Sequence, residues 1–357
     1  MGHFRKNTIT ILMAEQCNLA CRYCYVGARG EKSIDVEFAK AGIGDFFKEN
    51  VPAIRFFGAG EPTLEMPKIK ELWEFAKKNA NGELFSELQT NGVFNIDTMN
   101  WIKDHITMTW ISCDGMPEIQ NFNRPTQRGN PCAGVVESSI AGLARGKNGV
   151  GVRATICNNN VYRQNEMIDY FHSLGVKAVF ADHLCMKVYD GNKDFEHVPE
   201  MEYAREFLKA KKYAQKYGMF YSNFLTVNFD EPVVVSCRQG LPAPHLTPSG
   251  YVSSCDMVSE LTGSVLDALI YGKWLPEEGR IEYYEDKIKK IKERKVGNIS
   301  ECATCPIEKH CAGGCTGEAI NETGEFFGVK KNLCEATRFL AEELGVNYPK
   351  AYQYAHP

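Results

Sequence analysis

Three cysteines near the start of the chain, Cys17, Cys21 and Cys24, have the spacing Cys-x3-Cys-x2-Cys. They directly follow a predicted strand, so we expect them on the loop at its carboxyl end, where barrel enzymes place their chemistry. Three thiolates can hold three irons of a [4Fe–4S] cluster and leave the fourth iron open to a non-protein ligand. On spacing alone, a zinc site or a redox-active Cys-x2-Cys pair remains an alternative.

A second set of cysteines lies in the C-terminal third, within residues 237–334, which contain seven of the fourteen cysteines. These are Cys237, Cys255, Cys302, Cys305, Cys311, Cys315 and Cys334. Zinc is again an alternative, but seven thiols divide awkwardly into structural zinc sites of four ligands each. The segment is rich in glycine and proline, so we expect few periodic elements and a fold organised around metal. Four isolated cysteines, which we expect to be buried structural thiols, are Cys113, Cys132, Cys157 and Cys185.

These residues must be positioned by an alternation of strands and helices over the first 190 or so residues. The predicted strands are Thr8–Met13, Ile54–Phe57, Leu84–Gln89, Met108–Ser112, Val150–Ile156 and Val176–Ala181. Amphipathic stretches lie between them, which predicts an α/β fold with a parallel sheet. Six such units predict a partial (β/α)6 TIM-like barrel. One more helix is expected over 200–218, with a domain boundary near 222 that separates domains 1–222 and 223–357.

The composition is that of a globular protein, with 44% hydrophobic and 24% charged residues among 357. The net charge of −4 and the absence of a Lys/Arg run give no support to a nucleic-acid partner. The sequence has no apolar stretch that approaches a membrane span and no secretion signal. We therefore expect a cytoplasmic protein whose cysteines stay reduced and available to metals.

The Cys-x3-Cys-x2-Cys motif after the first strand resembles the signature of the radical S-adenosylmethionine (SAM) superfamily, and the C-terminal spacing resembles its SPASM domain. The resemblance implies three [4Fe–4S] clusters and SAM as cofactors. Beside the Cys17 cluster, it implies one auxiliary cluster on Cys302, Cys305, Cys311 and Cys334 and another on Cys237, Cys255 and Cys315. Sulfatase-modifying relatives carry a further cysteine shortly after the first of these, and residues 238–245 contain none here. The resemblance therefore implies that one iron of the Cys237, Cys255 and Cys315 cluster is open. Substrate, His245 or another residue would bind it.

The same resemblance implies the contacts of SAM. Gly60 and Glu61, in a Gly-Ala-Gly-Glu-Pro run after the second strand, would bind its ammonium; the family has glycine where Ala59 stands. Ser112, in a Ser-x-Asp-Gly motif, would contact the ribose, and Arg124 the carboxylate, because a guanidinium fork suits a carboxylate. Tyr23 and Leu184 would lie against the adenine, with plain packing as the alternative for both. The run Gly129-Asn-Pro-Cys132 departs from the family's Gly-x-Gly-Ser.

By resemblance, the chain is an oxidoreductase that cleaves SAM to a 5′-deoxyadenosyl radical and oxidatively modifies a peptide or protein side chain by crosslinking, thioether formation or dehydrogenation. Asp256 would be the general base, with an ordinary exposed aspartate as the alternative. An electron donor such as flavodoxin or ferredoxin is implied. With sixteen residues before Cys17, we expect no N-terminal peptide-binding domain. The alternatives are a sulfatase-maturing (formylglycine-generating) enzyme, a small-molecule dehydrogenase and a zinc-stabilised interaction module.

Overall fold

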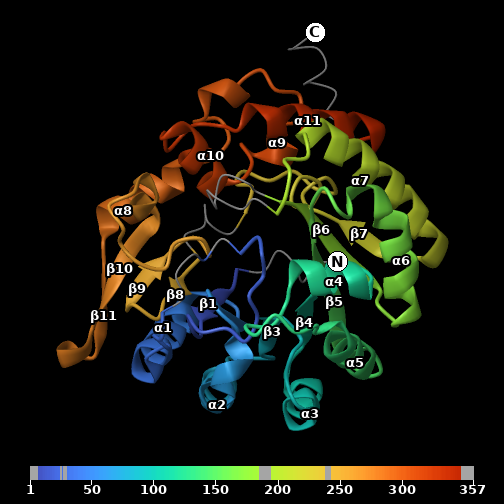
Figure 1. Ribbon diagram of the computed structural model, residues 1–357. Coiled ribbons are helices and arrows are strands. Elements are labelled where there is room, and N and C mark those ends of the chain that lie inside the picture. The colour runs from blue at the N-terminus through green and yellow to red at the C-terminus, as the bar shows by residue number, and fades with distance from the viewer. Residues whose placement is uncertain (1–6, 25, 27–29, 185–193, 238–242, 347–357) are drawn as a thin grey trace.

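The computed structural model describes residues 7–24, 26, 30–184, 194–237 and 243–346. Its strands form one sheet in the order β11-β10-β9-β8-β1-β2-β3-β4-β5-β6-β7. The first seven strands are β1 Ile9–Leu12, β2 Ala53–Phe57, β3 Phe85–Thr90, β4 Met108–Ser112, β5 Gly149–Ile156, β6 Ala178–His183 and β7 Phe220–Ser222. Each of them is parallel to its neighbour, so their carboxyl ends meet along one edge of a curved sheet (Figure 1). The α/β fold and the six predicted strands are thereby confirmed, with β4 at its predicted bounds.

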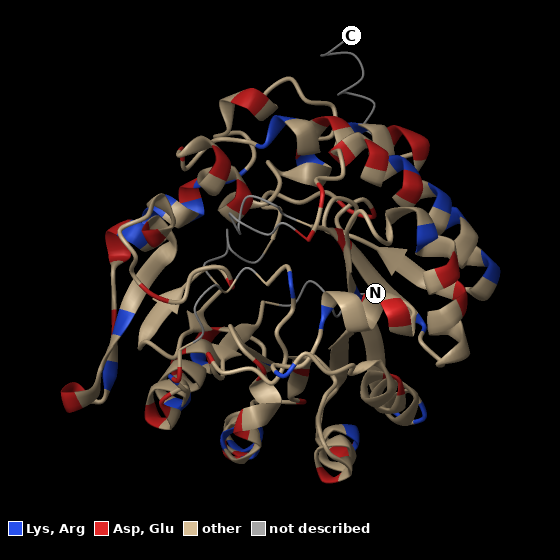
Figure 2. Cartoon of the chain, viewed as in Figure 1, with Lys and Arg blue, Asp and Glu red and all other residues tan. Residues whose placement is uncertain are grey.

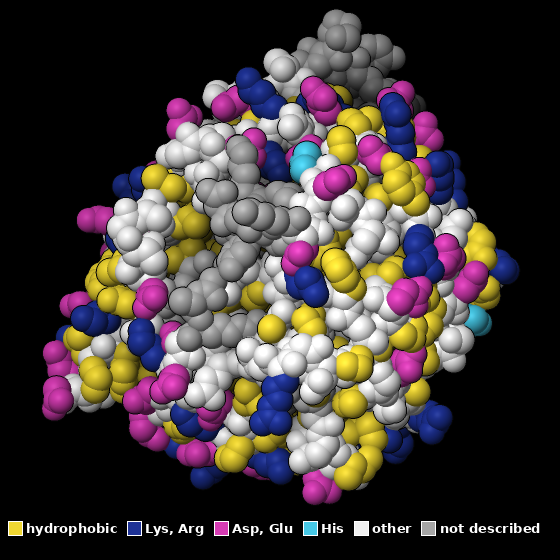
Figure 3. All heavy atoms as spheres, viewed as in Figure 1, with side chains coloured by type: hydrophobic (Ala, Val, Ile, Leu, Met, Phe, Trp, Pro, Cys, Tyr) yellow, Lys and Arg dark blue, Asp and Glu magenta, His cyan; other side chains and the backbone are white. Residues whose placement is uncertain are grey.

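Helices follow the strands, and all of them except α4 Pro117–Asn123, which lies near the carboxyl ends of the strands, cover the outer side of the sheet (Figure 1). The other helices are α1 Val36–Glu49, α2 Met66–Asn79, α3 Ile96–His105, α5 Ala133–Ala144, α6 Gln164–Ser173 and α7 Glu200–Ala214. In α2 the predicted apolar stripe is buried, from Ile69 to Ala76, as a periodicity of 3.6 residues requires. Lys, Arg, Asp and Glu lie mainly on the outward faces of these helices (Figure 2). On the face drawn in Figure 3, both signs of charge are interspersed among the described residues.

The C-terminal part contains more regular structure than the sequence suggested. It has strands β8 His245–Leu246, β9 Tyr251–Ser253, β10 Ile270–Leu275 and β11 Arg280–Tyr283, and helices α8 Glu285–Glu293, α9 Glu308–Cys311, α10 Thr316–Thr323 and α11 Lys331–Glu343. The expectation of few regular elements was therefore wrong. Strands of two or three residues show no measurable alternation, and pairing with the sheet, rather than local sequence, stabilises them.

These C-terminal strands extend the same sheet. Strand β8 is parallel to β1, and β9, β10 and β11 continue it in antiparallel fashion. Trp274 of β10 stacks on Phe38 of α1 with ring centroids 5.6 Å apart, and α11 packs against α7 (Figure 1). One apolar core therefore includes side chains from both parts of the chain. Among the described residues, no helix combines the length and apolarity that a membrane span needs.

Candidate functional site

A cavity of about 390 Å³ lies where the parallel strands β1 to β6 end. Its lining includes every residue predicted to contact the first cluster or SAM: Cys17, Cys21, Cys24, Tyr23, Gly60, Glu61, Ser112, Arg124 and Leu184. Asp256, which follows β9, lines the same cavity. The fold therefore gathers, at the carboxyl edge of its sheet, residues that are spread over 240 positions of sequence.

The cysteine loop is held by the segment that carries Arg124. The backbone N–H of Ala20 donates to Pro125 O at 2.8 Å, and that of Arg22 donates to Asn123 O at 2.9 Å. The side-chain amide of Gln127 donates to the carbonyls of Cys17 and Leu19, at 3.1 and 3.0 Å. These contacts fix the backbone from Cys17 to Arg22 without using a thiol.

The cysteines themselves are free and half-buried. Burial raises the pKa of the Cys21 thiol to about 12; the charge of Arg124 acts in the opposite direction, and Cys24 and Cys17 raise the pKa further. Such a thiol keeps its proton until a metal replaces it. The side-chain amide of Asn91 lies 3.7 Å from Cys17 Sγ and can donate to it. Three thiols that line one cavity and an N–H donor to sulfur fit an iron–sulfur cluster.

Gly60 lets the loop after β2 approach the cysteine loop very closely. A Cβ atom at this position would lie 1.9 Å from Gln16 O, so no larger residue fits. Two hydrogen bonds fix the contact, from Gly60 N–H to Ala14 O at 2.8 Å and from Glu61 N–H to Gln16 O at 2.7 Å. Ala59 does not have a positive φ angle, so alanine causes no backbone strain where the family has glycine.

The carboxylate of Glu61 is buried and anchors this loop to the end of β3. Its Oε1 accepts from Thr63 N–H at 3.0 Å, Thr63 Oγ1 at 2.7 Å and Thr90 Oγ1 at 2.6 Å. Its Oε2 accepts from Asn91 N–H at 2.7 Å. Burial raises the pKa of Glu61, although these four donors act against the rise. Glu61 thus fixes the cavity wall, and its contact with the ammonium of SAM stays a prediction.

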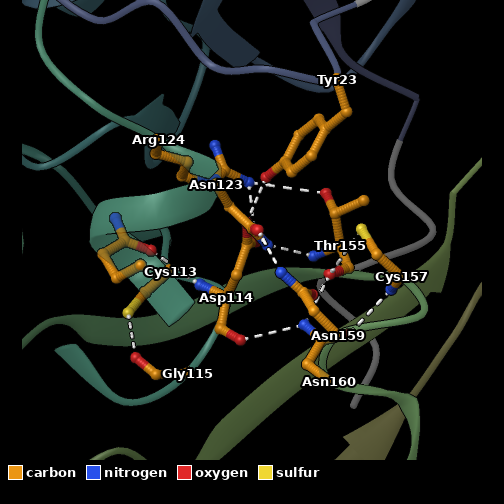
Figure 4. A network of polar contacts seen from close by, with 11 residues as sticks. Tyr23, Cys113, Asp114, Gly115, Asn123, Arg124, Thr155, Cys157, Asn159 and Asn160 are labelled. Atoms are coloured by element: carbon orange, nitrogen blue, oxygen red, sulfur yellow. Dashed lines mark hydrogen bonds and ion pairs between the residues drawn. The ribbon is translucent and has the colours of Figure 1, made fainter. Parts of the chain in front are cut away.

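Arg124 and Asp114 form a buried ion pair at the centre of a polar network (Figure 4). The Nε and Nη2 of Arg124 donate to the two oxygens of Asp114 at 3.1 and 3.0 Å, which is a bidentate arrangement. Among the described residues Arg124 Nη1 has no partner, and it can serve a ligand carboxylate in the cavity. Because Asp114 outweighs the effect of burial, the pKa of Arg124 lies well above its usual value.

Tyr23 and Thr155 complete this network. The Tyr23 hydroxyl donates to Asp114, and the Thr155 N–H donates to the other oxygen of that carboxylate at 2.9 Å. The Arg124 guanidinium lies 5.2 Å from the centre of the Tyr23 ring. Tyr23 therefore packs within the protein and also lines the cavity. Its packing role does not conflict with the predicted contact to the adenine. Leu184 is half-buried, lines the cavity and donates its N–H to Ile156 O at 2.9 Å.

Asp256 lies between two basic side chains. Arg55 Nη1 donates to its Oδ2 at 3.0 Å, and His245 Nε2 lies 2.9 Å from its Oδ1. Burial alone would raise the pKa of Asp256, but Arg55 and His245 outweigh that effect and hold the pKa well below its usual range. The other ring nitrogen of His245 is 2.9 Å from Ala243 O. Both ring nitrogens of His245 are thus engaged, so this histidine is not oriented as a ligand for an open iron.

The auxiliary cysteines lie in two groups in the structure, and the clusters that the resemblance implies for them stay a prediction. A second cavity of about 400 Å³ is lined by Cys237, Cys255 and Cys315 and shares Arg55 and Asp256 with the first. Burial raises the pKa of Cys255 to about 12, and the charges of Asp256 and then Cys237 raise it further. The three thiols therefore lie beside the cavity of the cofactor residues.

The other group contains Cys302, Cys305, Cys311 and Cys334. Burial raises the pKa of Cys311 to about 12, and the other three thiols raise it further, in the order Cys334, Cys302, Cys305. Buried Arg294 lies near both groups, and its Nη1 and Nη2 donate to backbone carbonyls at 2.7 and 3.0 Å. Within the described ranges, no three Cys, His, Asp or Glu side chains converge on a point that would suit a single metal ion.

Sequence reasoning missed several residues of this site: Arg55, Asn91, Asp114 and Asn123. Asp114 stands in the quoted Ser-x-Asp-Gly motif and could have been found there, but the others belong to no short motif. Cys113, Cys132 and Cys157 are buried, as predicted. Cys185 lies outside the described residues.

Comparisons with known proteins agree with this geometry. The model of the Radical SAM superfamily matches residues 11–131. An uncharacterized protein of Methanocaldococcus jannaschii is 27% identical over 218 residues, which cover 60% of this chain and 73% of that protein. Fe-coproporphyrin III synthase of Methanosarcina barkeri is 27% identical over 195 residues, which cover 52% of this chain and 45% of the synthase.

Two solved structures share the fold over nearly the whole chain. One is anSMEcpe with bound AdoMet and the Kp18Cys peptide, with a TM-score of 0.75, 19% identity and coverage of 95% of this chain and 96% of that one. The other is SuiB of Streptococcus suis bound to S-adenosylmethionine, with a TM-score of 0.67, 13% identity and coverage of 93% and 78%. At these identities the matches establish the similarity of fold.

Proposed function

We propose that this chain, whose residues 11–131 match the model of the Radical SAM superfamily, is a radical SAM oxidoreductase that modifies a peptide or protein side chain. In this proposal the curved parallel sheet is a partial (β/α)6 barrel, and residues 223–357 are a SPASM domain. Cys17, Cys21 and Cys24 bind the first [4Fe–4S] cluster. Cys302, Cys305, Cys311 and Cys334 bind one auxiliary cluster, and Cys237, Cys255 and Cys315 bind another.

The observation that carries this proposal is the shared cavity. Asp256 lines the same cavity as the cysteine loop, the Gly60 loop and Arg124, and it also lines the neighbouring cavity of Cys255. A substrate between them would touch the radical-generating residues on one side and the auxiliary thiols on the other. This is the arrangement that an oxidation needs, in which hydrogen is removed at one point and a proton and an electron leave at another.

The residues have separate roles in this proposal. Bound together at the first cavity, the cluster and SAM supply a 5′-deoxyadenosyl radical, which can take hydrogen from an unactivated C–H bond. Arg124 Nη1 binds the carboxylate of SAM, while its Nε and Nη2 remain on Asp114. The Ser112 hydroxyl has no partner among the described residues and can bind the ribose. Gly60 brings the loop after β2 to the ammonium, and Tyr23 and Leu184 border the adenine.

Asp256 is proposed to accept the substrate proton. Arg55 and His245 keep its carboxylate ionised at neutral pH, so it is available as an acceptor without prior deprotonation. Its low pKa also makes it a weak base, which suits a substrate whose proton has become acidic through oxidation. Arg55 itself is fixed by Gln89 Oε1 at 3.1 Å and Glu87 Oε1 at 3.1 Å, so the carboxylate has a defined direction into the cavity.

A peptide substrate is supported by the similarity to anSMEcpe and SuiB, which have been solved with the Kp18Cys peptide and the precursor peptide SuiA. The test is anaerobic turnover of reconstituted protein with SAM, a reductant such as flavodoxin or ferredoxin, and candidate peptides, followed by mass spectrometry. A peptide lighter by two hydrogens supports the proposal. Release of 5′-deoxyadenosine with no change in any peptide, but with loss of hydrogen from a small molecule, contradicts it.

A second candidate is formylglycine formation on a sulfatase. The observation that favours it is Asp256, directly after Cys255 and inside the cofactor cavity. Hydrazide labelling separates the two outcomes for a cysteine peptide, because both products lack a free thiol and formylglycine alone has an aldehyde. A thioaldehyde hydrolyses to formylglycine with an aldehyde that hydrazide reagents label, whereas a thioether has neither a free thiol nor an aldehyde.

A further inference from the structure

Arg294 is a buried cation that the proposed chemistry does not use. Among the described residues three arginines are buried: Arg55, Arg124 and Arg294. Arg55 lies 3.0 Å from a carboxylate oxygen of Asp256, and Arg124 lies 3.0 Å from one of Asp114. Arg294 forms no ion pair with a carboxylate in the described part of the chain. Another kind of negative group must offset its charge, because burying a charge is costly unless the charge is paired.

Neutral oxygen atoms hold the guanidinium of Arg294 in place. Its Nε donates to Thr316 Oγ1 at 3.0 Å, its Nη1 to Phe326 O at 2.7 Å and its Nη2 to Gly328 O at 3.0 Å. Each nitrogen of the guanidinium thus makes one hydrogen bond, which fixes the direction of the side chain. These acceptors are a hydroxyl and two backbone carbonyls, so they leave the positive charge in place.

These contacts place the guanidinium beside the segment that joins the two groups of auxiliary thiols. Cys311 belongs to the group of four thiols and Cys315 to the group of three, with three residues between them. Thr316, which accepts from Arg294, directly follows Cys315. A Cβ atom placed on Gly313, between the two cysteines, would lie 3.9 Å from Arg294 Nη2. Arg294 therefore touches the link between the two groups on both of its sides.

The negative groups that act most strongly on Arg294 are thiols. Burial lowers the pKa of Arg294, and nearby acidic groups oppose this effect, which decreases in the order Cys302, Cys315, Cys237 and Glu301. Cys302 belongs to the group of four thiols, whereas Cys315 and Cys237 belong to the group of three. Thiols become negatively charged thiolates when they bind a metal. Both groups can therefore offset the charge of Arg294.

Other cations near the auxiliary thiols are exposed or paired with carboxylates. Arg338, whose charge acts on one of the thiols, is exposed on α11, so water and salt screen it. Lys330 Nζ lies 3.3 Å from Glu200 Oε1 and 3.6 Å from Glu318 Oε2. Within the described ranges, Arg294 is thus the buried cation near these thiols that no carboxylate pairs with.

We propose that Arg294 is the shared counter-ion of the two auxiliary clusters and raises the reduction potential of both. This inference rests on the proposed function, since it presupposes clusters at the two groups of thiols. Reduction adds one negative charge to a cluster, so a buried positive charge beside it stabilises the reduced form more than the oxidised one. Net charge is one of the factors that set the potential of such clusters. Arg294 thereby helps both clusters to accept the electron that the substrate loses.

The test compares Arg294→Gln, which keeps an N–H donor but removes the charge, with Arg294→Lys, which keeps the charge. Lys295→Met is the matched control, because it removes the same charge from an exposed position one residue away. All are made in a Cys17→Ala/Cys21→Ala/Cys24→Ala background, so that spectra report the auxiliary clusters alone. After anaerobic reconstitution, iron is counted per chain. The midpoint potential of each cluster is measured by reductive titration and electron paramagnetic resonance.

We expect Arg294→Gln to lower both potentials. At a fixed applied potential, the ratio of reduced to oxidised cluster should fall about tenfold or more, which corresponds to about 59 mV for a one-electron couple. Arg294→Lys should stay close to the chain with Arg294, and Lys295→Met should shift neither potential. Failure of Arg294→Gln to assemble the clusters, with assembly in Arg294→Lys, supports the proposal equally, since only the charged side chain then sustains them.

Three results would overturn it. Unchanged potentials in Arg294→Gln would show that the charge does not act on the clusters, and a shift of one potential alone would show that the counter-ion is not shared. Equal shifts, or equal loss of the clusters, in Arg294→Gln and Arg294→Lys would show that the hydrogen bonds of the guanidinium matter and its charge does not. A chain with Arg294 intact that binds no auxiliary cluster would instead contradict the proposed function.

Discussion

The carboxylate of Asp256 lies 3.0 Å from Nη1 of Arg55, although the two residues are 201 positions apart in the sequence. The contact joins β2 to the loop after β9 and directs Asp256 into the cavity of the cofactor residues. Asp256→Asn keeps the shape but removes the proton acceptor. We expect 5′-deoxyadenosine release to continue while product formation falls about 100-fold or more, the scale of losing a general base. Both are measured in the same anaerobic reaction.

Glu87→Gln is the matched control for that variant, because it also removes a carboxylate from Arg55 but lines only the second of the two cavities described. Product should form in Glu87→Gln in proportion to the deoxyadenosine released. Equal uncoupling in both variants would show that Asp256 acts only by fixing Arg55.

Gly60 should tolerate no side chain. In Gly60→Ala the new Cβ atom meets Gln16 O at 1.9 Å, so the loop after β2 must move away from the cysteine loop. We expect a loss of about 3 kcal/mol in the free energy of unfolding and a large loss of SAM affinity, measured by denaturation and calorimetry. Gly44→Ala, in α1 with nothing near its Cβ position, should instead stabilise by about 0.5–1 kcal/mol. Unchanged SAM affinity in Gly60→Ala would contradict this role for the loop.

Asp114 should be needed mainly to hold Arg124. Asp114→Asn leaves a buried guanidinium without its counter-charge, and breaking such a pair costs about 3–5 kcal/mol. We therefore expect lower stability together with weaker binding of SAM. Asp104→Asn, an exposed position of α3, should change stability by no more than about 0.5 kcal/mol. An Asp114→Asn protein as stable as the Asp104→Asn control would mean that the ion pair makes no net contribution to the free energy of unfolding.

His183 predicts a specific dependence of stability on pH. Burial lowers its pKa from 6.5 to about 4, so between these values the unfolded chain binds a proton that the folded chain excludes. Stability is therefore full above pH 6.5 and falls as the pH decreases toward 4. From pH 7.5 to 5.5 the loss due to His183 should be about 1 kcal/mol. The free energy of unfolding is measured at both pH values for the reconstituted protein and for His183→Gln. The loss on acidification should be larger in the unsubstituted protein by this amount, and an equal loss in the two proteins would contradict the prediction.

The sequence predicted the frame of the site because its signals are local. An apolar run such as Met108–Ser112 defines a strand by itself, and the Cys17 loop and the Gly60 loop are short motifs at strand ends. Parallel pairing then places those ends together whatever the details of packing. This is why the residues predicted to contact the first cluster and SAM all line one cavity.

Other features depend on contacts that no local pattern records. The sequence does not distinguish Arg55 from other strand residues, because its partner Asp256 follows β9, far away in the chain. Asn91 belongs to the site because the loop after β3 contacts Cys17. Strands β8 and β9 are too short to show alternation. Strand β8 forms by pairing with β1, and β9 by pairing with β8 and β10. The sequence likewise could not show that Glu61 anchors its loop, because this role depends on hydrogen bonds from Thr90 and Asn91, which lie about 30 positions later.

The central claim is that Cys17, Cys21 and Cys24 bind a cluster that cleaves SAM. The most direct measurement is 5′-deoxyadenosine release by the reconstituted chain with SAM and a reductant, alongside iron per chain, for the unsubstituted protein and Cys17→Ala. The account predicts a brown protein with about twelve irons that releases deoxyadenosine, and a Cys17→Ala variant that has lost about a third of the iron and all of the release. Release that survives in Cys17→Ala, or a colourless protein that binds zinc, would contradict it.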